Sequence, residues 1–205
     1  MSRENVIVIR YDSPDVEADL DVVYFHCRGS SEREAGWALP LFGRANVRSY
    51  RGPLGQGGGF AWFQNAAVGV ALPESLARET AKVRDWVAAD TGRRQPWLCG
   101  FSNGAALAAN LLIEAPDAYA GLIMIGGCFA VEDEALPTGA LAGKQVLFCR
   151  GRSDDVMPRH KFEQAESYLT GASGACATLL GYDGGHELPL SIKSSVQGWL
   201  SAADR

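Results

Sequence analysis

The fold is decided by the stretch Pro96–Glu114, which reads PWLCGFSNGAALAANLLIE. Its first half, 96–101, is apolar and predicts a strand, whereas 103–114 is rich in Ala and Leu and predicts a helix. Because that helix is apolar on nearly every face, we expect it to lie buried against a sheet. Between the two, Gly100-Phe101-Ser102-Asn103-Gly104 fits the pattern G-x-S-x-G, a sharp turn that exposes the Ser102 hydroxyl at the positive end of a helix.

Segments of two kinds alternate on either side of this stretch. Further strands are predicted at 6–9, 21–26, 46–50, 122–125, 145–149 and 177–180, and further helices at 74–90, 162–169 and 192–200. This alternation, with central strands that are apolar throughout, predicts an α/β fold with a mostly parallel central sheet and helices on both faces. The early strands follow one another closely, which suggests an antiparallel start. Residues 52–71 and 126–144 lack a clear element, and long loops of this kind are often functional.

The composition is that of an ordinary globular protein. The chain has 205 residues, of which 47% are hydrophobic and 21% charged, and we expect one domain that spans residues 1–205. Its net charge of −5 and the lack of a Lys/Arg cluster argue against a nucleic-acid partner. Acidic residues gather at 12–21, where a solvated loop is expected.

The cysteine pattern and the amino-terminal sequence indicate the compartment. Five cysteines without a C-x-x-C pair lie in or beside apolar runs, so we interpret them as reduced core residues and not as disulfides or zinc ligands. The chain shows no signal-peptide pattern and no run of 18 apolar residues. A cytoplasmic protein without a membrane span is therefore expected.

A serine nucleophile needs a base and an acid that orients the base. Of the three histidines, His186 lies in Gly184-Gly185-His186-Glu187 after the last predicted strand, on a loop suited to a base. The segment after the strand 145–149 offers two carboxylates, Asp154 and Asp155. From the residues alone, either one could serve as the acid.

The segment Gly151–Pro158 matches the pattern G-x-x-D-x-V-x-P. With the serine motif, it resembles the phospholipase/carboxylesterase group of α/β-hydrolases, which includes small bacterial carboxylesterases and acyl-protein thioesterases. The resemblance covers most of the chain, from about residue 22 onward, and implies that Asp154 is the acid. It gives the order Ser102, Asp154, His186 that this fold uses.

The resemblance also implies where a developing oxyanion would be bound. One donor is expected to be the backbone N–H of Asn103, directly after the nucleophile. In the resembled group the second donor comes from a loop that reads H-G-x-G, and here the loop reads His26-Cys27-Arg28-Gly29. By position the N–H of Arg28 is the second donor. Cys27 departs from the pattern and is interpreted as a small packed residue.

Aromatic residues in the two long loops are candidates for a substrate pocket. Phe60, Trp62 and Phe63 resemble a Trp-Phe segment that walls the entrance to the site in the same group, and Phe129 lies in the second loop. These side chains would form a small apolar cleft for an acyl or aromatic ester group. The alternative is that they only cover the core.

These features predict a serine hydrolase that cleaves carboxylic esters through an acyl-enzyme, with a small-molecule ester as substrate and no metal or organic cofactor. Short-chain esters are expected, because 126–144 is too short for a helical lid. An acyl thioesterase with the same residues and a catalytically weak ligand-binding protein of the same fold stay open as alternatives. The sequence leaves the choice between a monomer and a homodimer open.

Overall fold

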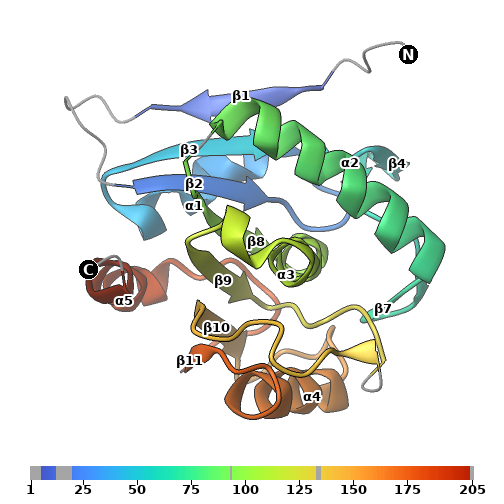
Figure 1. Cartoon of the computed structure of the whole chain (residues 1–205), viewed down its shortest axis with the longest axis vertical. Helices are drawn as coiled ribbons and strands as arrows, with labels where there is room; N and C mark the ends of the chain where they lie inside the picture. Colours follow the sequence, from blue (N-terminus) through green and yellow to red (C-terminus); the bar gives the residue numbers. More distant parts are fainter. Residues whose placement is uncertain (1–5, 13–19, 93, 133–134, 204–205) are drawn as a thin grey trace.

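A seven-stranded sheet runs through the middle of the molecule (Figure 1). The computed structural model describes residues 6–12, 20–92, 94–132 and 135–203. In spatial order the strands are β1 (Val8–Tyr11), β3 (Ala45–Tyr50), β2 (Leu20–Phe25), β8 (Trp97–Phe101), β9 (Gly121–Ile125), β10 (Gln145–Gly151) and β11 (Cys176–Tyr182). The strands from β3 to β11 are parallel to their neighbours, and β1 runs antiparallel to β3. The expected antiparallel start is thus a single edge strand.

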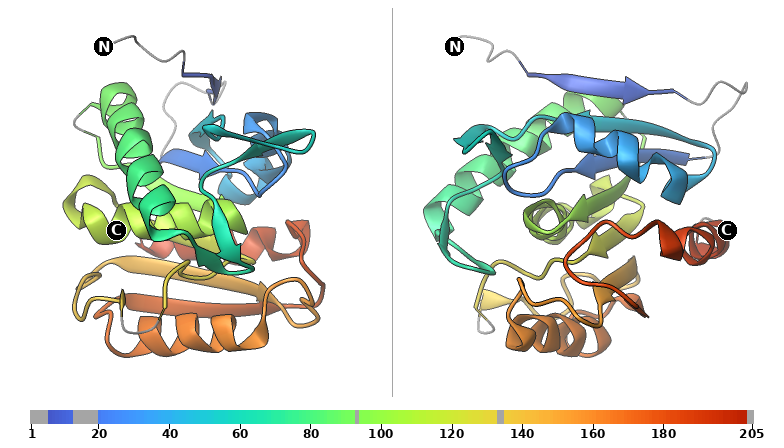
Figure 2. Two further views of the ribbon diagram at one scale, coloured as in Figure 1. Left: turned by 90° about the vertical axis from the view of Figure 1, so that its right-hand side faces the viewer. Right: turned by 180° about the vertical axis from the view of Figure 1, so that it is seen from behind.

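Helices cover both faces of this sheet (Figure 2). One face carries α1 (Ala35–Phe42) and α5 (Lys193–Ala203), and the other carries α2 (Pro73–Thr91), α3 (Asn103–Glu114) and α4 (Arg159–Thr170). Short 3₁₀ turns are found at Glu32–Glu34, Pro116–Ala118 and Leu190–Ile192. The alternation of strands and helices predicts this α/β arrangement, and the family resemblance implies its particular form, the α/β-hydrolase fold.

The alternation of side chains along β2 explains why both faces of the sheet need a cover. Val22 and Tyr24 pack into the cluster beneath α1 and α5, whereas Val23 and Phe25 pack into the cluster beneath α2, α3 and α4. All four side chains are fully buried. Successive residues of a strand point to opposite faces, so the hydrophobic run 22–25 requires helices on both sides.

Residues 52–71 form two small hairpins at the carboxyl end of the sheet. β4 (Leu54–Gln56) pairs with β5 (Gly59–Ala61), and β6 (Asn65–Ala67) pairs with β7 (Val70–Ala71). Strands of two or three residues are too short to show an alternating pattern in the sequence. The second hairpin brings residues 65–69 to the same pocket as Ser102, which directly follows β8.

The cysteines depart in part from the expected core positions. Cys99, Cys128 and Cys149 are buried, but Cys27 is half-buried and Cys176 is exposed on the edge strand β11. All five are free thiols. An edge strand is covered on fewer sides than a central one, so its apolar run does not guarantee burial.

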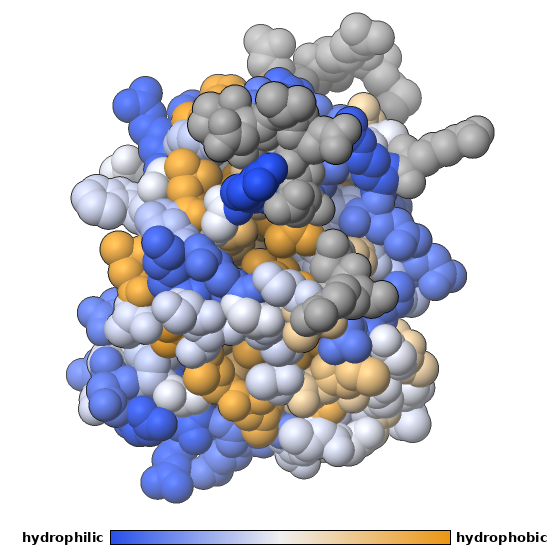
Figure 3. All heavy atoms as spheres, turned by 90° about the vertical axis from the view of Figure 1, so that its left-hand side faces the viewer, coloured by the Kyte–Doolittle hydropathy of each residue, from blue (hydrophilic) through white to orange (hydrophobic). Residues whose placement is uncertain are grey.

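The amino-terminal ends of the parallel strands lie at one face of the molecule, and their carboxyl ends lie at the opposite face. Figure 3 shows hydrophilic side chains interspersed with hydrophobic ones on this face. Within the described residues, no helix is long and apolar enough to cross a membrane. The acidic segment expected as a solvated loop lies mostly at 13–19, outside the described residues.

Candidate active site

Ser102 lies at the tight turn between β8 and α3. Its φ of 55° and ψ of −115° make it the one residue other than glycine with positive φ in the described part of the chain. The turn is closely packed: a Cβ on Gly100 would lie 2.3 Å from a backbone atom of Gly104, and a Cβ on Gly104 would lie 2.0 Å from the oxygen of Phe25. Both positions of the motif therefore require glycine, and a strained backbone presents the serine hydroxyl.

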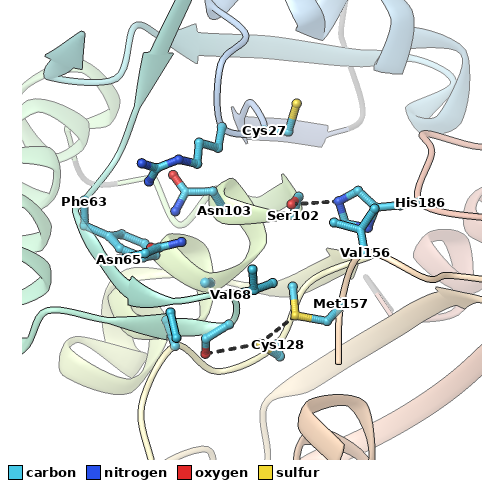
Figure 4. A pocket seen from close by; sticks show the side chains of 15 residues that line it. Cys27, Phe63, Asn65, Val68, Ser102, Asn103, Cys128, Val156, Met157 and His186 are labelled. Carbon is cyan, nitrogen blue, oxygen red and sulfur yellow. Dashed lines mark hydrogen bonds between the residues drawn. The ribbon is translucent and has the colours of Figure 1, made fainter. Parts of the chain in front are cut away.

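His186 faces Ser102 from the loop after β11 (Figure 4). Its Nε2 lies 2.9 Å from the Ser102 Oγ, and its Nδ1 lies 2.8 Å from Oδ2 of Asp154. The imidazole packs against the ring of Phe101 with 5.1 Å between the ring centroids. These contacts fix the ring with one nitrogen toward the hydroxyl and the other toward the carboxylate.

The Asp154 carboxylate is fixed by its own loop, which follows β10. Its side chain is fully buried, and Oδ1 accepts hydrogen bonds from the backbone N–H groups of Val156, at 3.1 Å, and Met157, at 3.0 Å. A Cβ on Gly151 would lie 2.3 Å from the oxygen of Gly185, so the acid loop and the histidine loop pack directly together. The structure brings Asp154, and not the exposed Asp155, to His186.

The two predicted oxyanion donors are the backbone N–H groups of Arg28 and Asn103. Within the described residues, neither the N–H of Arg28 nor that of Asn103 donates a hydrogen bond. Asn103 begins α3, and the first N–H groups of a helix have no partner in the helix itself. Its side-chain Oδ1 accepts a hydrogen bond from the N–H of Trp62 at 3.0 Å. This bond links the turn at Ser102 to the 60–63 segment.

His26 holds the loop that carries Arg28. The ring is completely buried; its Nε2 accepts a hydrogen bond from the N–H of Gly52 at 3.0 Å, and Trp62 Nε1 donates to the His26 carbonyl at 2.8 Å. Burial lowers the pKa of the imidazole below its usual range, so its neutral form accepts the Gly52 bond. His26 is therefore a structural residue of this loop.

A pocket of about 480 Å³ opens beside Ser102. Its lining comes from the loop after β2, the 63–69 segment, the start of α3, the loop after β9 and the acid loop. The residues are Cys27, Arg28, Phe63, Asn65, Ala67, Val68, Gly69, Ser102, Asn103, Ala106, Cys128, Ala130, Val156, Met157 and His186. Most of these side chains are small and apolar, which suits a short apolar group next to the serine.

Of the four aromatic residues expected in the pocket, only Phe63 lines it. Trp62 is completely buried, with its ring against Phe25 and His26. Phe129 packs edge-on against Tyr168 in the core, and Phe60 lies under the guanidinium of Arg51. For these three the expectation was wrong. Trp62 and Phe129 are buried in the core, where large apolar rings are more favourable than in an open cleft. Phe60 is half-buried and packs against Arg51 instead of the pocket.

The pocket wall also contains residues that the sequence did not reveal. Val68, at the turn of the β6–β7 hairpin, is 54% exposed and lines the pocket. Val156 and Met157 line it as well, because their N–H groups bind Asp154 and hold their side chains beside the site. Their position directly after the acid was a usable signal for this contact. Within the described residues, no group of three His, Cys, Asp or Glu side chains is arranged to hold a metal ion.

Comparison with known proteins identifies the family of this chain. The model of the phospholipase/carboxylesterase family matches residues 58–201. The chain belongs to this family. A curated relative, "Putative hydrolase MhqD" of Bacillus subtilis (strain 168), is 29% identical over 196 residues, with 91% of this chain and 94% of the relative covered.

Solved structures share the fold of this family member. The Bacillus cereus carboxylesterase superposes with a TM-score of 0.83 at 23% identity, over 97% of this chain and 95% of the other. YahD with malic acid gives a TM-score of 0.82 at 21% identity, over 97% and 99% of the two chains. Esterase PE8 gives 0.80 at 23% identity, over 97% and 99%. The chain therefore belongs to a hydrolase family and shares its fold with solved carboxylesterases.

This family member departs from the loop pattern H-G-x-G at Cys27, and Glu34 accommodates the change. The Glu34 carboxylate accepts hydrogen bonds from the N–H of Cys27 and from the Tyr24 hydroxyl through Oε1, at 3.0 and 2.8 Å. Its Oε2 accepts from the Cys27 thiol at 3.0 Å. Burial and the nearby carboxylate raise the pKa of that thiol to about 12.

Figure 4 shows the Cys27 sulfur turned away from Ser102. Since the thiolate is the nucleophilic form of cysteine, a protonated thiol bound to a carboxylate is inert. Cys27 is therefore a packed residue of the loop, and Glu34 fixes the backbone immediately before Arg28.

We expect Glu34→Ala to lower kcat for an ester by roughly 10-fold to 100-fold with little change in KM. Three donors lose their acceptor, and the backbone N–H of Arg28, the predicted oxyanion donor, becomes less well fixed. Steady-state kinetics on a chromogenic ester measures the effect, and Glu32→Ala in the same loop is the comparison, because Glu32 pairs with Arg51 and does not contact Cys27. An equal loss in both variants would mean that Glu34 only stabilises the fold.

Proposed function

We propose that this protein is a serine hydrolase that cleaves carboxylic esters of small molecules through an acyl-enzyme. The observation that carries the proposal is the hydrogen-bonded series from the Ser102 Oγ through His186 to the buried Asp154. A hydroxyl, an imidazole and a carboxylate in this order match the needs of acyl transfer. Structural neighbours that are named carboxylesterases or esterases support the ester as substrate.

In the proposed reaction, Ser102 Oγ attacks the ester carbonyl while its proton passes to Nε2 of His186. Asp154 accepts the Nδ1–H of the imidazole, which keeps Nε2 free to take the proton and stabilises the imidazolium that forms. The N–H groups of Arg28 and Asn103 donate to the negative oxygen of the tetrahedral intermediate.

Collapse of this intermediate breaks the bond to the alcohol, which leaves with the proton from His186. The Ser102 oxygen then carries the acyl group. A water molecule gives a proton to His186 and attacks the acyl carbonyl, and the second intermediate releases the acid and returns the proton to Ser102. Every proton transfer uses the same nitrogen, Nε2, which lies 2.9 Å from the Ser102 Oγ.

A fluorophosphonate probe tests the nucleophile directly. We expect stoichiometric labelling of the native protein at Ser102, because such probes react with activated serine hydroxyls. Ser195→Ala, which changes an exposed serine on α5, is the matched control and should label like the parent. Labelling that persists in Ser102→Ala, or a native protein that does not label, would overturn the proposal.

The pocket sets an expectation for the acyl group. With about 480 Å³ lined mainly by small side chains, it buries few methylene groups, each worth about 0.8 kcal/mol. We expect kcat/KM for p-nitrophenyl esters to peak at short acyl chains, roughly two to eight carbons by this burial argument. Assays across acyl lengths, below the micelle concentration of each ester, measure the peak.

Ala106 offers a sharper form of this test. It lies on α3, lines the pocket and is nearly buried. In Ala106→Leu the added carbons reduce the space for substrate, so the optimum should move to shorter chains while turnover of the acetyl ester is kept. A steady rise in kcat/KM up to palmitoyl esters would contradict a small pocket.

A further inference from the structure

Arg28 gives the pocket a positive charge that no carboxylate in the described structure balances. Among the pocket-lining residues it is the one Arg or Lys, and none of them is Asp or Glu. Its Nη2 donates to the neutral Gln56 Oε1 on β4 at 2.6 Å, and no ion pair to Arg28 occurs within the described residues.

This is unusual in a chain with a net charge of −5. Other arginines meet carboxylates: Arg51 pairs with Glu32, and Arg48 pairs with Asp21. Arg150 likewise pairs with Glu166. A guanidinium at a pocket mouth with only an amide partner keeps most of its five N–H donors for a ligand.

The pocket lining contains a second polar group without a fixed partner. Figure 4 shows Asn65, on β6, extending its side chain into the pocket. Its Oδ1 is buried and receives no hydrogen bond within the described structure. Buried amide oxygens are normally paired, so an unpaired one inside a pocket points to a ligand group, and no protein donor prevents the amide from turning its NH₂ toward an anion.

We propose that the preferred substrates are esters that carry a second, anionic group, a carboxylate, a few carbons from the reacting carbonyl, and that the Arg28 side chain binds this group. The inference rests on the proposed ester hydrolysis. Arg28 would then have two roles: its backbone N–H donates to the oxyanion, and its guanidinium binds the carboxylate. The distance between these two groups of the substrate is therefore limited by the length of the Arg28 side chain. A planar guanidinium binds a carboxylate with two parallel hydrogen bonds, which gives both strength and orientation.

A monoester of a short dicarboxylic acid meets this description, and its diester is the neutral comparison. We would measure ethanol release from monoethyl glutarate and diethyl glutarate at pH 7.5, where the free carboxyl is ionised. We expect kcat/KM to favour the monoester about 10-fold, the scale of one charge-assisted hydrogen bond. The preference should shrink as ionic strength rises from about 20 mM to 500 mM, because the guanidinium is exposed to solvent.

Variants locate the effect, and the ratio of the two kcat/KM values cancels any loss that both substrates share. Arg28→Gln should bring the ratio to about one or below, since it loses the charge. Arg28→Lys should keep part of the preference, because it keeps the charge without the planar pair of donors. In Gln56→Glu a carboxylate meets the guanidinium and competes with the substrate, so the ratio should again fall.

The outcomes separate the two proposals. If the parent hydrolyses both esters equally, or if Arg28→Gln and Gln56→Glu leave its preference for the monoester unchanged, the anionic-substrate proposal fails while ester hydrolysis stands. If neither ester nor any p-nitrophenyl ester is hydrolysed and Ser102 does not take the fluorophosphonate label, the proposed function itself fails.

Discussion

Ser102→Ala is expected to lower kcat for any ester by about 10⁴-fold or more, the loss typical when the nucleophile of such a group of residues is removed. The substitution removes only the hydroxyl group, and the glycines that form the turn stay in place. Any turnover that remains would come from binding and from the N–H donors acting on a water molecule. Burst and steady-state kinetics on p-nitrophenyl acetate measure the loss.

The fold of this variant can be checked independently of activity. Serine and alanine meet the same backbone strain at φ 55°, so the thermal unfolding midpoint should be close to that of the parent. Ser102→Gly should be equally inactive and more stable, because glycine relieves a strain of about 1–3 kcal/mol. A variant that keeps more than about a tenth of the parent kcat, against that scale of loss, would show that Ser102 is not the nucleophile.

The elements around this serine could be predicted because their signals are local. The helix at 103–114 has the bounds expected from the sequence, since glycines fix its start and Pro116 follows its end. The strands β8, β9 and β10 also lie where apolar runs predicted them. In contrast, α1 at 35–42 escaped prediction, because it is short and contains Gly36 and Pro40, both unfavourable inside a helix.

The pocket wall could not be predicted in the same way, because it depends on contacts between distant segments. Val68 reaches the site only through the β6–β7 hairpin, and Cys128 contacts the oxygen of Gly69 and the sulfur of Met157 from separate loops. Trp62 shows the reverse case: its resemblance to a Trp-Phe segment at the entrance of the family's site suggested a pocket residue. Instead, its indole N–H donates to the His26 carbonyl inside the core. Sequence spacing does not encode such long-range packing.

The two adjacent carboxylates of the acid loop should differ sharply in their effects on activity. We expect Asp154→Asn to lower kcat by about 10⁴-fold, because the amide no longer favours the imidazole tautomer with hydrogen on Nδ1. Oδ1 of Asp154 already accepts two backbone N–H groups, so the oxygen of an asparagine would keep those bonds. Its NH₂ would then face His186, which forces the proton onto Nε2, where it blocks proton transfer from Ser102.

Asp155→Asn is the matched control, since it makes the same chemical change one residue away. Asp155 is exposed, and Oδ2 of Asp154 holds the place on His186 Nδ1 at 2.8 Å, so we expect kcat within a few-fold of the parent. Parallel kcat measurements with both variants, alongside their thermal unfolding midpoints, separate loss of mechanism from loss of fold. If Asp155→Asn were inactive and Asp154→Asn were tolerated, Asp155 would be the acid. The buried Asp154 carboxylate would then have a purely structural role.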